Sequence, residues 1–492
     1  MLDVLIIGGG VIGCSIAREL SRYKLDVALV EANCDVGRGT TGANTGIVHN
    51  GYDPKPGTMK ARFNVLGNLM FDQLAEDLQF TFNRCGSYVV GFNDEDMLTI
   101  QKLMGQSTLN GAPGCYIASR EEVMEREPNI TPEVKGALFH NSGVCASYEL
   151  VGAIADNAMQ NGVKIHCSNE VTAIKQLPDD SFEVTTTKDQ YHAKHVINCA
   201  GLFADVIAEM AGAEFIKQKP RRGDYFIFDK KYAGFLNTVI FPCPGPMGKG
   251  VLVTPLPEGN ILIGPSSTDT DLRDSNYTLQ EELDFVWKNA TRCFPNLPRT
   301  DVIASFMGLR SEGAEYRDFY IKASDKLKGF VNLSCIASPG LTSSPAIAQY
   351  VADILRNEFG LQMDPDPEFN PRREGIHHFF HADWEERAKL IEKDHHYGRI
   401  VCRCETVTEG EVIDAIHRAP GTVTLGSVKY RTRAGMGRCQ GGFCTCRVMD
   451  LISRETGMSK EEITTRGEGS NIVMGRIKEL EMEGGAEDDK EC

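Results

Sequence analysis

Five cysteines lie close together near the C-terminus of this 492-residue chain. Two form Cys402-Arg403-Cys404 and two form Cys439-Gln440-Gly441-Gly442-Phe443-Cys444. Four thiolates at one point carry a large negative charge, which a soft metal ion or an iron–sulfur cluster compensates. Structural zinc usually uses two C-x2-4-C pairs, and a C-x-C pair fits that pattern poorly. A cluster is therefore favoured, with zinc or a set of empty or disulfide-forming thiols as the alternatives. Cys446 is a fifth thiol that could replace a ligand.

A second pattern with chemical meaning opens the chain, where Gly8, Gly10 and Gly13 fit G-x-G-x-x-G. The first glycine permits a tight turn, the second lets a pyrophosphate approach the backbone, and the third lets a helix pack on a strand. Glu31 follows about 20 residues later, where a carboxylate can accept hydrogen bonds from ribose hydroxyls. These residues predict a bound dinucleotide, with a plain strand–turn–helix as the alternative.

The elements that must position these residues follow from the apolar pattern. Val4–Ile7 is short, wholly apolar and ends at glycine, which predicts a buried strand. Residues 11–22 predict the helix whose N-terminus faces the phosphates, and residues 27–30 predict the second strand. Residues 37–49 are rich in glycine and hydroxyl side chains and predict an irregular loop. Such a loop can lie along a pyrophosphate and a flavin edge, which favours FAD over NAD; a plain surface loop is the alternative.

Composition limits the class of protein. A formal net charge of −16 with no strongly basic block argues against nucleic-acid binding. No apolar run approaches the ~20 residues that span a bilayer, and no export leader precedes the first strand. Sixteen cysteines, most of them scattered singly, indicate a reducing compartment. We therefore expect a cytoplasmic protein of several domains.

A family resemblance rests on three stretches: Gly39-Thr40-Thr41, residues 44–52 (NTGIVHNGY) and residues 55–62 (KPGTMKAR). They resemble the D-amino-acid-oxidase-type FAD-dependent oxidoreductases, in the branch of glycerol-3-phosphate and L-2-hydroxyglutarate dehydrogenases. The resemblance covers roughly residues 1–365 and implies FAD as the dinucleotide. It also implies the fold class: an α/β FAD-binding Rossmann-like domain of the glutathione-reductase type, interleaved with an α+β substrate domain on an antiparallel sheet, plus a small C-terminal helical domain with four cysteines.

The domain boundaries are expected as follows. FAD-binding parts lie at about 1–80, 150–220 and 305–365, and substrate-domain parts at about 81–149 and 221–304. The chain returns to the first domain through Gly308-Leu309-Arg310 and a strand at residues 329–334. An Asp-Pro-Asp-Pro run starts a linker over 366–397, which is followed by the cysteine domain at 398–450 and by a C-terminal helix and acidic tail at 451–492.

The resemblance also implies which residues contact FAD. They are Gly8, Gly10, Val11, Ile12, Gly13, Glu31, Ala32, Thr40, Thr41, Asn44, Thr45, Gly46, Ile47, Val171, Ala200, Gly201, Gly308, Gly340, Leu341 and Thr342. In the family, Val171 offers its backbone to the adenine, and the helix that opens at Gly340 faces the pyrimidine end of the flavin. Its N–H groups and dipole would stabilise the charge of the reduced ring.

Residues 398–450, with the basic glycine-rich loop 432–437, resemble the small domain named after bacterioferritin-associated ferredoxin. This resemblance implies a 2Fe–2S cluster held by Cys402, Cys404, Cys439 and Cys444. Between the two cysteine pairs, Thr408-Glu409-Gly410-Glu411 predicts a capping box that starts a helix.

Two residues resemble the catalytic residues of the flavoenzyme family. His49 matches its active-site histidine and suits a general base, because an unperturbed histidine pKa of about 6.5 lies near the operating pH; covalent attachment of FAD is a second role for it. Arg310 matches the arginine over the flavin, and its planar fork suits a carboxylate or a phosphate. Arg317, Arg221 and Arg222 are weaker candidates that read better as solvated surface charges.

A flavin and a cluster on one chain imply conversion of two-electron into one-electron transfer. The combination resembles the large subunits of anaerobic glycerol-3-phosphate dehydrogenases, which work with electron-transfer partner subunits. We expect a dehydrogenase of a small anionic secondary alcohol, glycerol 3-phosphate first, with no membrane span and membrane association only through a partner. The alternatives are an L-2-hydroxyglutarate dehydrogenase, an amine or amino-acid oxidase subunit, and an electron-transfer subunit without a substrate of its own.

Overall fold

The computed structural model describes residues 1–244 and 250–475. The chain divides into two compact units, Met1–Gly375 and Ile376–Cys492. Within the two described ranges, no helix is both long and apolar enough to cross a membrane. The predicted acidic tail, residues 479–492, lies outside the described residues.

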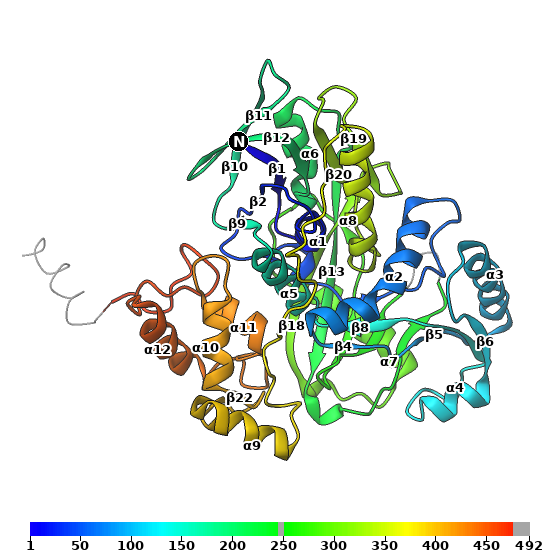
Figure 1. Cartoon of the computed structure of the whole chain (residues 1–492). Coiled ribbons are helices and arrows are strands. Elements are labelled where there is room, and N and C mark those ends of the chain that lie inside the picture. Colours follow the sequence, from blue (N-terminus) through cyan, green and yellow to red (C-terminus); the bar gives the residue numbers. More distant parts are fainter. Residues whose placement is uncertain (245–249, 476–492) are drawn as a thin grey trace, which may run out of the picture. The chain divides into compact units, whose positions relative to one another are not determined.

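An eight-stranded sheet in the first unit carries the predicted dinucleotide turn (Figure 1). Its strands are β1 (Leu2–Ile7), β2 (Val27–Val30), β9 (Lys164–His166), β10 (Val171–Gln176), β11 (Phe182–Thr186), β12 (Gln190–Asn198), β19 (Tyr320–Ala323) and β20 (Phe330–Ser334). Five of them run parallel in the order β20-β12-β1-β2-β9. The first two predicted strands are therefore confirmed, and both lie inside the parallel part of the sheet.

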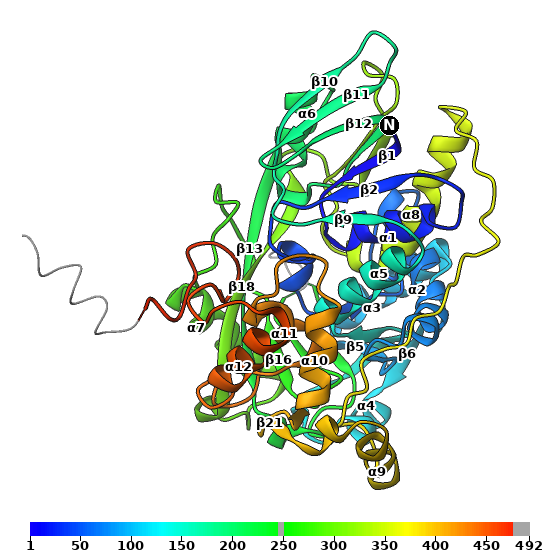
Figure 2. The ribbon, with the colours of Figure 1, turned by 60° about the vertical axis from the view of Figure 1, so that its left-hand side comes forward.

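Alternating residues of β1 face two separate cores. Val4 and Ile6 pack with helices α1 (Val11–Leu20), α5 (Ser147–Gln160) and α8 (Gly340–Asn357). Leu5 and Ile7 pack with β10, β11 and α6 (Ala204–Ala211) on the opposite face. Because successive strand residues point to opposite faces, a strand that is apolar throughout is buried on both. Figure 2 shows α1, α5 and α8 together on one face of this sheet.

A second sheet has nine strands. The segments of the chain that form it alternate with the segments that form the first sheet. The nine strands are β5 (Ser87–Gly91), β6 (Tyr116–Ser119), β7 (Gly136–His140), β13 (Gln218–Phe228), β14 (Val239–Pro242), β15 (Leu252–Pro255), β16 (Ile261–Gly264), β17 (Thr268–Asp269) and β18 (Val302–Gly313). Neighbours are antiparallel except for β14 with β5. Its helices are α3 (Asp94–Asn110), α4 (Arg120–Arg126) and α7 (Gln280–Cys293). This is the antiparallel sheet expected of the substrate domain.

The return to the first domain was predicted through residues 308–310 and a strand at 329–334; the strand is confirmed as β20 of the first sheet, whereas residues 308–310 are not part of that sheet. These residues still belong to β18, which pairs with β13 from Gln218↔Gly313 to Phe228↔Val302. The return comes later, with β19 and β20. A third, small sheet is formed by β3 (Ile47–Val48), β4 (Phe82–Asn83) and β8 (Gly143–Cys145), and helix α2 (Met59–Leu78) packs against α8.

The chain that follows α8 stays bound to the first unit. The backbone N–H of Asp366 donates to the carbonyl of Arg22 at 2.8 Å. Arg373 is buried and forms an ion pair with Asp156 of α5 at 3.1 Å. The predicted linker, 366–397, thus begins with residues held along this unit, and it also contains helix α9 (Trp384–Lys393).

The second unit is small and largely helical. Besides α9 it contains η5 (His395–Gly398), β21 (Ile400–Cys402), β22 (Val407–Thr408), α10 (Glu409–His417), α11 (Leu425–Thr432) and α12 (Thr445–Thr456). The predicted capping box is confirmed, because Thr408 Oγ1 accepts from the N–H of Glu411 and Glu411 Oε2 accepts from the N–H of Thr408. Val412, Val428 and Ile452 bring α10, α11 and α12 together in one core.

Candidate functional site

The glycine turn between β1 and α1 contains two kinds of glycine. Gly8 has φ +108°, and a Cβ there would lie 2.5 Å from the carbonyl oxygen of Cys199. A Cβ on Gly13 would overlap the carbonyl oxygen of Gly8. Close packing of the chain explains both. Gly10 differs, because its φ is an ordinary −74° and its Cβ would only touch Thr41 Oγ1 at 3.4 Å. The protein does not need a glycine there, whereas a pyrophosphate at the helix N-terminus does.

Glu31 lies beside this turn at the end of β2. Its carboxylate accepts hydrogen bonds from the N–H of Gly9 at 2.6 Å and from the backbone and side-chain nitrogens of Asn33 at 2.8 and 2.7 Å. The carbonyl of Glu31 accepts from the N–H of Asn169 at 2.8 Å, two residues before Val171. Glu31 and Val171, both predicted to contact the nucleotide, are therefore held in one region. Asn33 was not predicted. Ala32 is exposed.

The loop after β2 folds back over the glycine turn. Thr41 Oγ1 accepts from the N–H of Val11 at 3.0 Å, and Thr40 Oγ1 donates to the carbonyl of Leu309 at 2.8 Å. A Cβ on Gly308 would overlap the carbonyl oxygen of Ala43. The loop thus connects the first turn of α1 with β18. It was predicted to be irregular throughout, but it contains η1 (Thr40–Gly42) and β3, because the chain makes a short helical turn and then pairs with β8.

Asn44 shapes the next part of the loop. Its side-chain nitrogen donates to the carbonyl of Thr41 at 2.8 Å, and its Oδ1 accepts from the N–H of Gly46 at 2.7 Å. Gly46 has φ +69° and packs against the carbonyl of Cys145. Thr45 is half-buried between them, and Ile47 begins β3. The loop is consequently held in one conformation next to the predicted flavin site.

His49 follows β3 and is buried. Its backbone N–H donates to Thr342 Oγ1 at 2.9 Å, and its carbonyl accepts from Asn68 Nδ2 at 3.0 Å. Its ring lies 5.9 Å from the ring of Phe241, centroid to centroid. Thr342 stands in the first turn of α8, which begins at Gly340, so the predicted base and the predicted flavin-facing helix start are in direct contact.

Ala200 and Gly201 come two and three residues after the end of β12, and Ala200 lies against the glycine turn. A Cβ on Gly8 would come within 3.2 Å of the Cα of Ala200. The carbonyl of Gly201 accepts from Ser311 Oγ of β18 at 3.0 Å. The predicted FAD-contacting residues that follow β12 are therefore hydrogen-bonded to β18, which carries the predicted contact Gly308.

Arg310 lies half-buried on β18. Its guanidinium donates to the carbonyl of Ser266 at 3.1 Å and to Ser267 Oγ at 3.3 Å. Burial raises the pKa of Tyr225, and the nearby guanidinium of Arg310 opposes that rise. Among the residues that the structure describes, no carboxylate forms an ion pair with Arg310. The described groups that its guanidinium contacts are neutral oxygens, which leaves the positive charge suited to an anionic ligand.

The three other candidate arginines separate clearly. Arg317 is exposed, as expected of a solvated charge. Arg222 was also predicted to be a solvated surface charge, and this is wrong. Its side chain is buried and donates to the two carboxylate oxygens of Asp224 at 2.9 and 3.1 Å. It lies on the face of the strand opposite to that of Arg310. Arg221 is half-buried and donates to Ser267 Oγ at 2.6 Å.

The four predicted ligand cysteines form two pairs. The sulfurs of Cys404 and Cys439 lie 3.6 Å apart. Cys402 accepts a hydrogen bond from Cys444, which lowers the pKa of Cys402 to about 6. Among the described residues, no three of these sulfurs lie within 4.8 Å of one another. One zinc ion with Zn–S bonds of about 2.3 Å would bring all four to about 3.8 Å. Two separate pairs fit two iron atoms better than one zinc ion.

Backbone N–H groups surround two of the sulfurs: those of Glu405 and Gly435 at Cys402, and those of Gly441 and Phe443 at Cys439. Hydrogen bonds to cysteine sulfur are among the features that set the potential of an iron–sulfur centre. Cys446 lies on the first turn of α12 and is exposed.

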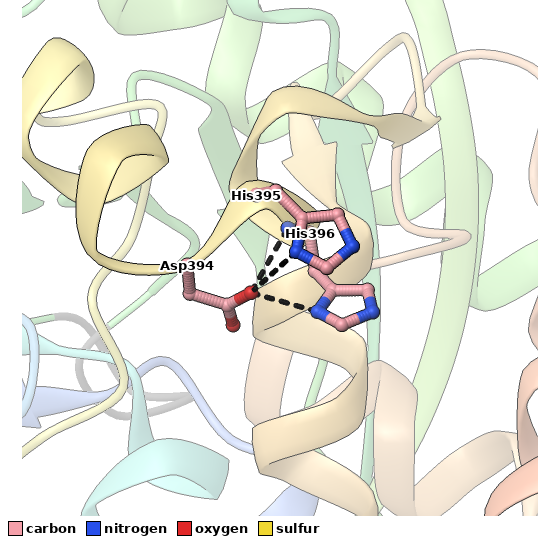
Figure 3. A group of neighbouring side chains, drawn as sticks. All are labelled: Asp394, His395 and His396. Carbon is pink, nitrogen blue, oxygen red and sulfur yellow. Dashed lines mark hydrogen bonds and ion pairs between the residues drawn. The ribbon is translucent and has the colours of Figure 1, made fainter.

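Asp394, His395 and His396 form a further group of metal-ligating side chains, which was not predicted (Figure 3). Asp394 Oδ1 lies 2.7 Å from Nδ1 of His396 and 3.9 Å from Nδ1 of His395. The same oxygen accepts from the backbone N–H of His396 at the start of η5, and this bond lowers the pKa of Asp394. Capping of η5 accounts for the arrangement.

Comparison with known proteins is consistent with this geometry. A family described as FAD dependent oxidoreductase matches residues 3–354, and the BFD-like [2Fe-2S] binding domain matches residues 400–454. A glycerol 3-phosphate dehydrogenase of Caloramator mitchellensis is 47% identical over 97% of this chain and 99% of its own length. Subunit A1 of the anaerobic glycerol-3-phosphate dehydrogenase of Haloferax volcanii is 26% identical over 97% of this chain and 86% of its own.

Among solved structures, the L-alpha-glycerophosphate oxidase of Mycoplasma pneumoniae with FAD bound aligns with a TM-score of 0.72. It is 31% identical and covers 76% of this chain and 98% of its own. These matches confirm the predicted fold class and the two predicted cofactors, FAD and a 2Fe–2S cluster.

Proposed function

This chain belongs to the FAD dependent oxidoreductase family, and from that premise we propose that it oxidises glycerol 3-phosphate to dihydroxyacetone phosphate. The observation that carries the choice of substrate class is Arg310, a half-buried cation whose described partners include neutral oxygens and no carboxylate. A guanidinium in that state binds an anion in a fixed orientation. The near-full-length similarity to a glycerol 3-phosphate dehydrogenase favours phosphate over carboxylate.

Bound FAD would supply a hydride acceptor, and a 2Fe–2S cluster would carry electrons onward one at a time. The glycine turn, Glu31 and the loop from Thr40 to Ile47 would hold the dinucleotide. Cys402, Cys404, Cys439 and Cys444 would hold the cluster. Gly10 supports the first assignment, since only a close ligand requires glycine there, and the two sulfur pairs support the second.

His49 is the residue proposed to take the proton of the substrate hydroxyl. Its backbone is fixed on both sides, by Thr342 and by Asn68, so the ring has a defined starting position. Arg310 is proposed to bind the phosphate end of the substrate. Holding that end leaves the hydroxyl carbon in a fixed orientation, which is the main advantage of a bound over a free reactant.

The relative from Haloferax volcanii is named as a subunit, and this supports a further part of the proposal. Partner subunits would receive electrons from the cysteine domain. Any membrane association would be through those partners, and the protein would work in the cytoplasm.

Anaerobic mixing of the purified protein with single substrates tests the proposal. Glycerol 3-phosphate should bleach the flavin absorbance faster than L-2-hydroxyglutarate or sarcosine. Faster bleaching by L-2-hydroxyglutarate or by sarcosine would assign the protein to one of those activities instead. Bleaching by none of them would leave a flavin that accepts electrons only from a partner.

A pair of arginine variants tests the binding residue. Arg310→Gln should lower kcat/KM for glycerol 3-phosphate by about 10- to 100-fold, since charge-assisted hydrogen bonds contribute about 1.5–3 kcal/mol. Arg317→Gln removes an exposed charge four residues after the end of β18 and should leave kcat/KM unchanged. Equal losses in the two variants would contradict the role given to Arg310. FAD content, measured from the absorbance, should be equal in both.

A further inference from the structure

Arg221 and Arg310 are direct cross-strand partners in the pairing of β13 with β18. Both guanidinium groups donate to one atom, Ser267 Oγ, at 2.6 and 3.3 Å. Like charges placed directly opposite each other in a sheet destabilise it. A shared hydroxyl does not neutralise either charge, and although Asp269 on β17 pairs with Arg221, no carboxylate of the described residues pairs with Arg310.

The pair lies on the face of the sheet that meets the loop following β2. Gly308 stands two residues before Arg310, and its missing side chain makes room for Ala43 of that loop. Residues two apart on a strand share a face, so Arg310 and its partner Arg221 face the same way as Gly308. Arg222, one residue on, points to the other face and pairs with Asp224.

Positive charge exceeds negative charge around this pair. In the described part of the chain Arg221 has one carboxylate partner, Asp269, at 3.5 Å, and Asp269 is shared with Lys219 at 3.3 Å. Ser267 accepts from both arginines and still has its own O–H to donate, because a hydroxyl carries two acceptor sites and one donor. Two planar cationic forks and one hydroxyl donor suit a group with several acceptor oxygens and a double charge.

We propose that Arg221, Arg310 and Ser267 together form a dianion site, which selects the doubly ionised phosphate of the substrate over a singly charged carboxylate. This inference rests on the proposed oxidation of glycerol 3-phosphate and specifies its binding step. Arg221 is the specificity residue, because Arg310 alone would accept either anion.

The test compares wild type with Arg221→Gln, Arg221→Lys and Lys219→Gln in the FAD-loaded full-length protein. KM and kcat for glycerol 3-phosphate are measured from pH 5.5 to 7.5, which spans the second ionisation of a phosphate monoester at a pKa of about 6. In wild type, KM should fall as the pH rises. In Arg221→Gln, KM should rise by about 10- to 100-fold with kcat nearly unchanged, and its pH dependence should flatten.

The two other variants and a binding measurement keep the outcomes separate. Arg221→Lys should recover part of the affinity, and Lys219→Gln, the matched loss of a neighbouring charge, should change KM less than about twofold because exposed charges are screened. An unchanged KM in Arg221→Gln, or an equal rise in Lys219→Gln, would overturn the site. Titration with inorganic phosphate, monitored by the flavin absorbance, measures anion binding at the site independently of turnover. Phosphate binding that weakens in Arg221→Gln, in a protein that glycerol 3-phosphate does not reduce, would refute the proposed function and uphold the dianion site.

Discussion

A 2.9 Å hydrogen bond joins the backbone N–H of His49 to Oγ1 of Thr342, residues that are 293 positions apart in the sequence. It connects the end of β3 with the first turn of α8. The proposed base and the helix start expected to face the flavin therefore depend on each other for their positions.

Replacement of Thr342 tests this dependence. Thr342→Val should slow flavin reduction by glycerol 3-phosphate about 10- to 100-fold, since small misplacements of a catalytic group have effects of that size. The unpaired N–H of His49 should also lower the free energy of unfolding by about 1–3 kcal/mol. Thr342→Ser keeps the hydroxyl and should retain most of the rate. Stopped-flow absorbance measures the rate. A slow Ser variant would show that the methyl group, not the hydrogen bond, is what matters.

Two glycines of the same turn should respond differently to alanine. At Gly10 the added Cβ meets only Thr41 Oγ1 at ordinary contact distance, so Gly10→Ala should fold normally but bind FAD more weakly. At Gly13 the Cβ overlaps the carbonyl of Gly8, so Gly13→Ala should lower the melting temperature of the protein even without FAD. Circular dichroism of flavin-free protein and FAD titration separate the two effects. Normal FAD affinity in the Gly10→Ala protein would show that the pyrophosphate does not bind beside Gly10.

Cysteine variants test the cluster. Cys404→Ser should abolish the 2Fe–2S absorbance and lower the iron content, while the flavin is still reduced by substrate. Cys446→Ser should leave the iron content unchanged, because Cys446 is exposed on α12 and is not in either sulfur pair. Iron analysis and electron paramagnetic resonance after reduction measure both. Zinc in place of iron in the purified wild type would contradict the two-pair interpretation.

We expect the free energy of unfolding to depend on pH through His195. Burial lowers its pKa below the ordinary value of 6.5, against a smaller opposing effect of Asp3. The unfolded chain therefore takes up this proton before the folded chain does. Stability from this source is present above pH 6.5 and is lost as the pH falls toward the folded pKa.

Melting temperatures at pH 7 and pH 5 check the effect of His195. The decrease should be smaller in His195→Gln than in wild type. His192→Gln, at an exposed position of the same strand, should show the wild-type decrease. Equal decreases in all three proteins would rule out His195 as a source.

Local signals in the sequence predicted the parts of the fold that depend on neighbouring residues. The strand–turn–helix around Gly8 and the capping box at Thr408 were both correct, because each is determined within a few residues. The shared hydroxyl between Arg221 and Arg310 could not be predicted, since it depends on the register of two strands far apart in the sequence.

The burial of Arg222 depends first on which face of β13 carries its side chain. A strand predicted through residues 221 and 222 would have placed the two arginines on opposite faces, because strand side chains alternate. The structure has such a strand, since β13 begins at Gln218. The burial of Arg222 against Asp224 would still have required the structure, because both are polar and their burial depends on each other.

The ion pair of Arg373 with Asp156 determines where the flavin-binding part of the chain can be cut without loss of stability. A flavin module excised at the end of α8 would keep Asp156 but lose Arg373, and breaking a buried pair in this way costs about 3–5 kcal/mol. A gene fusion or truncation that is to yield a stable flavin module must therefore retain the sequence through Gly375, whatever is attached after it.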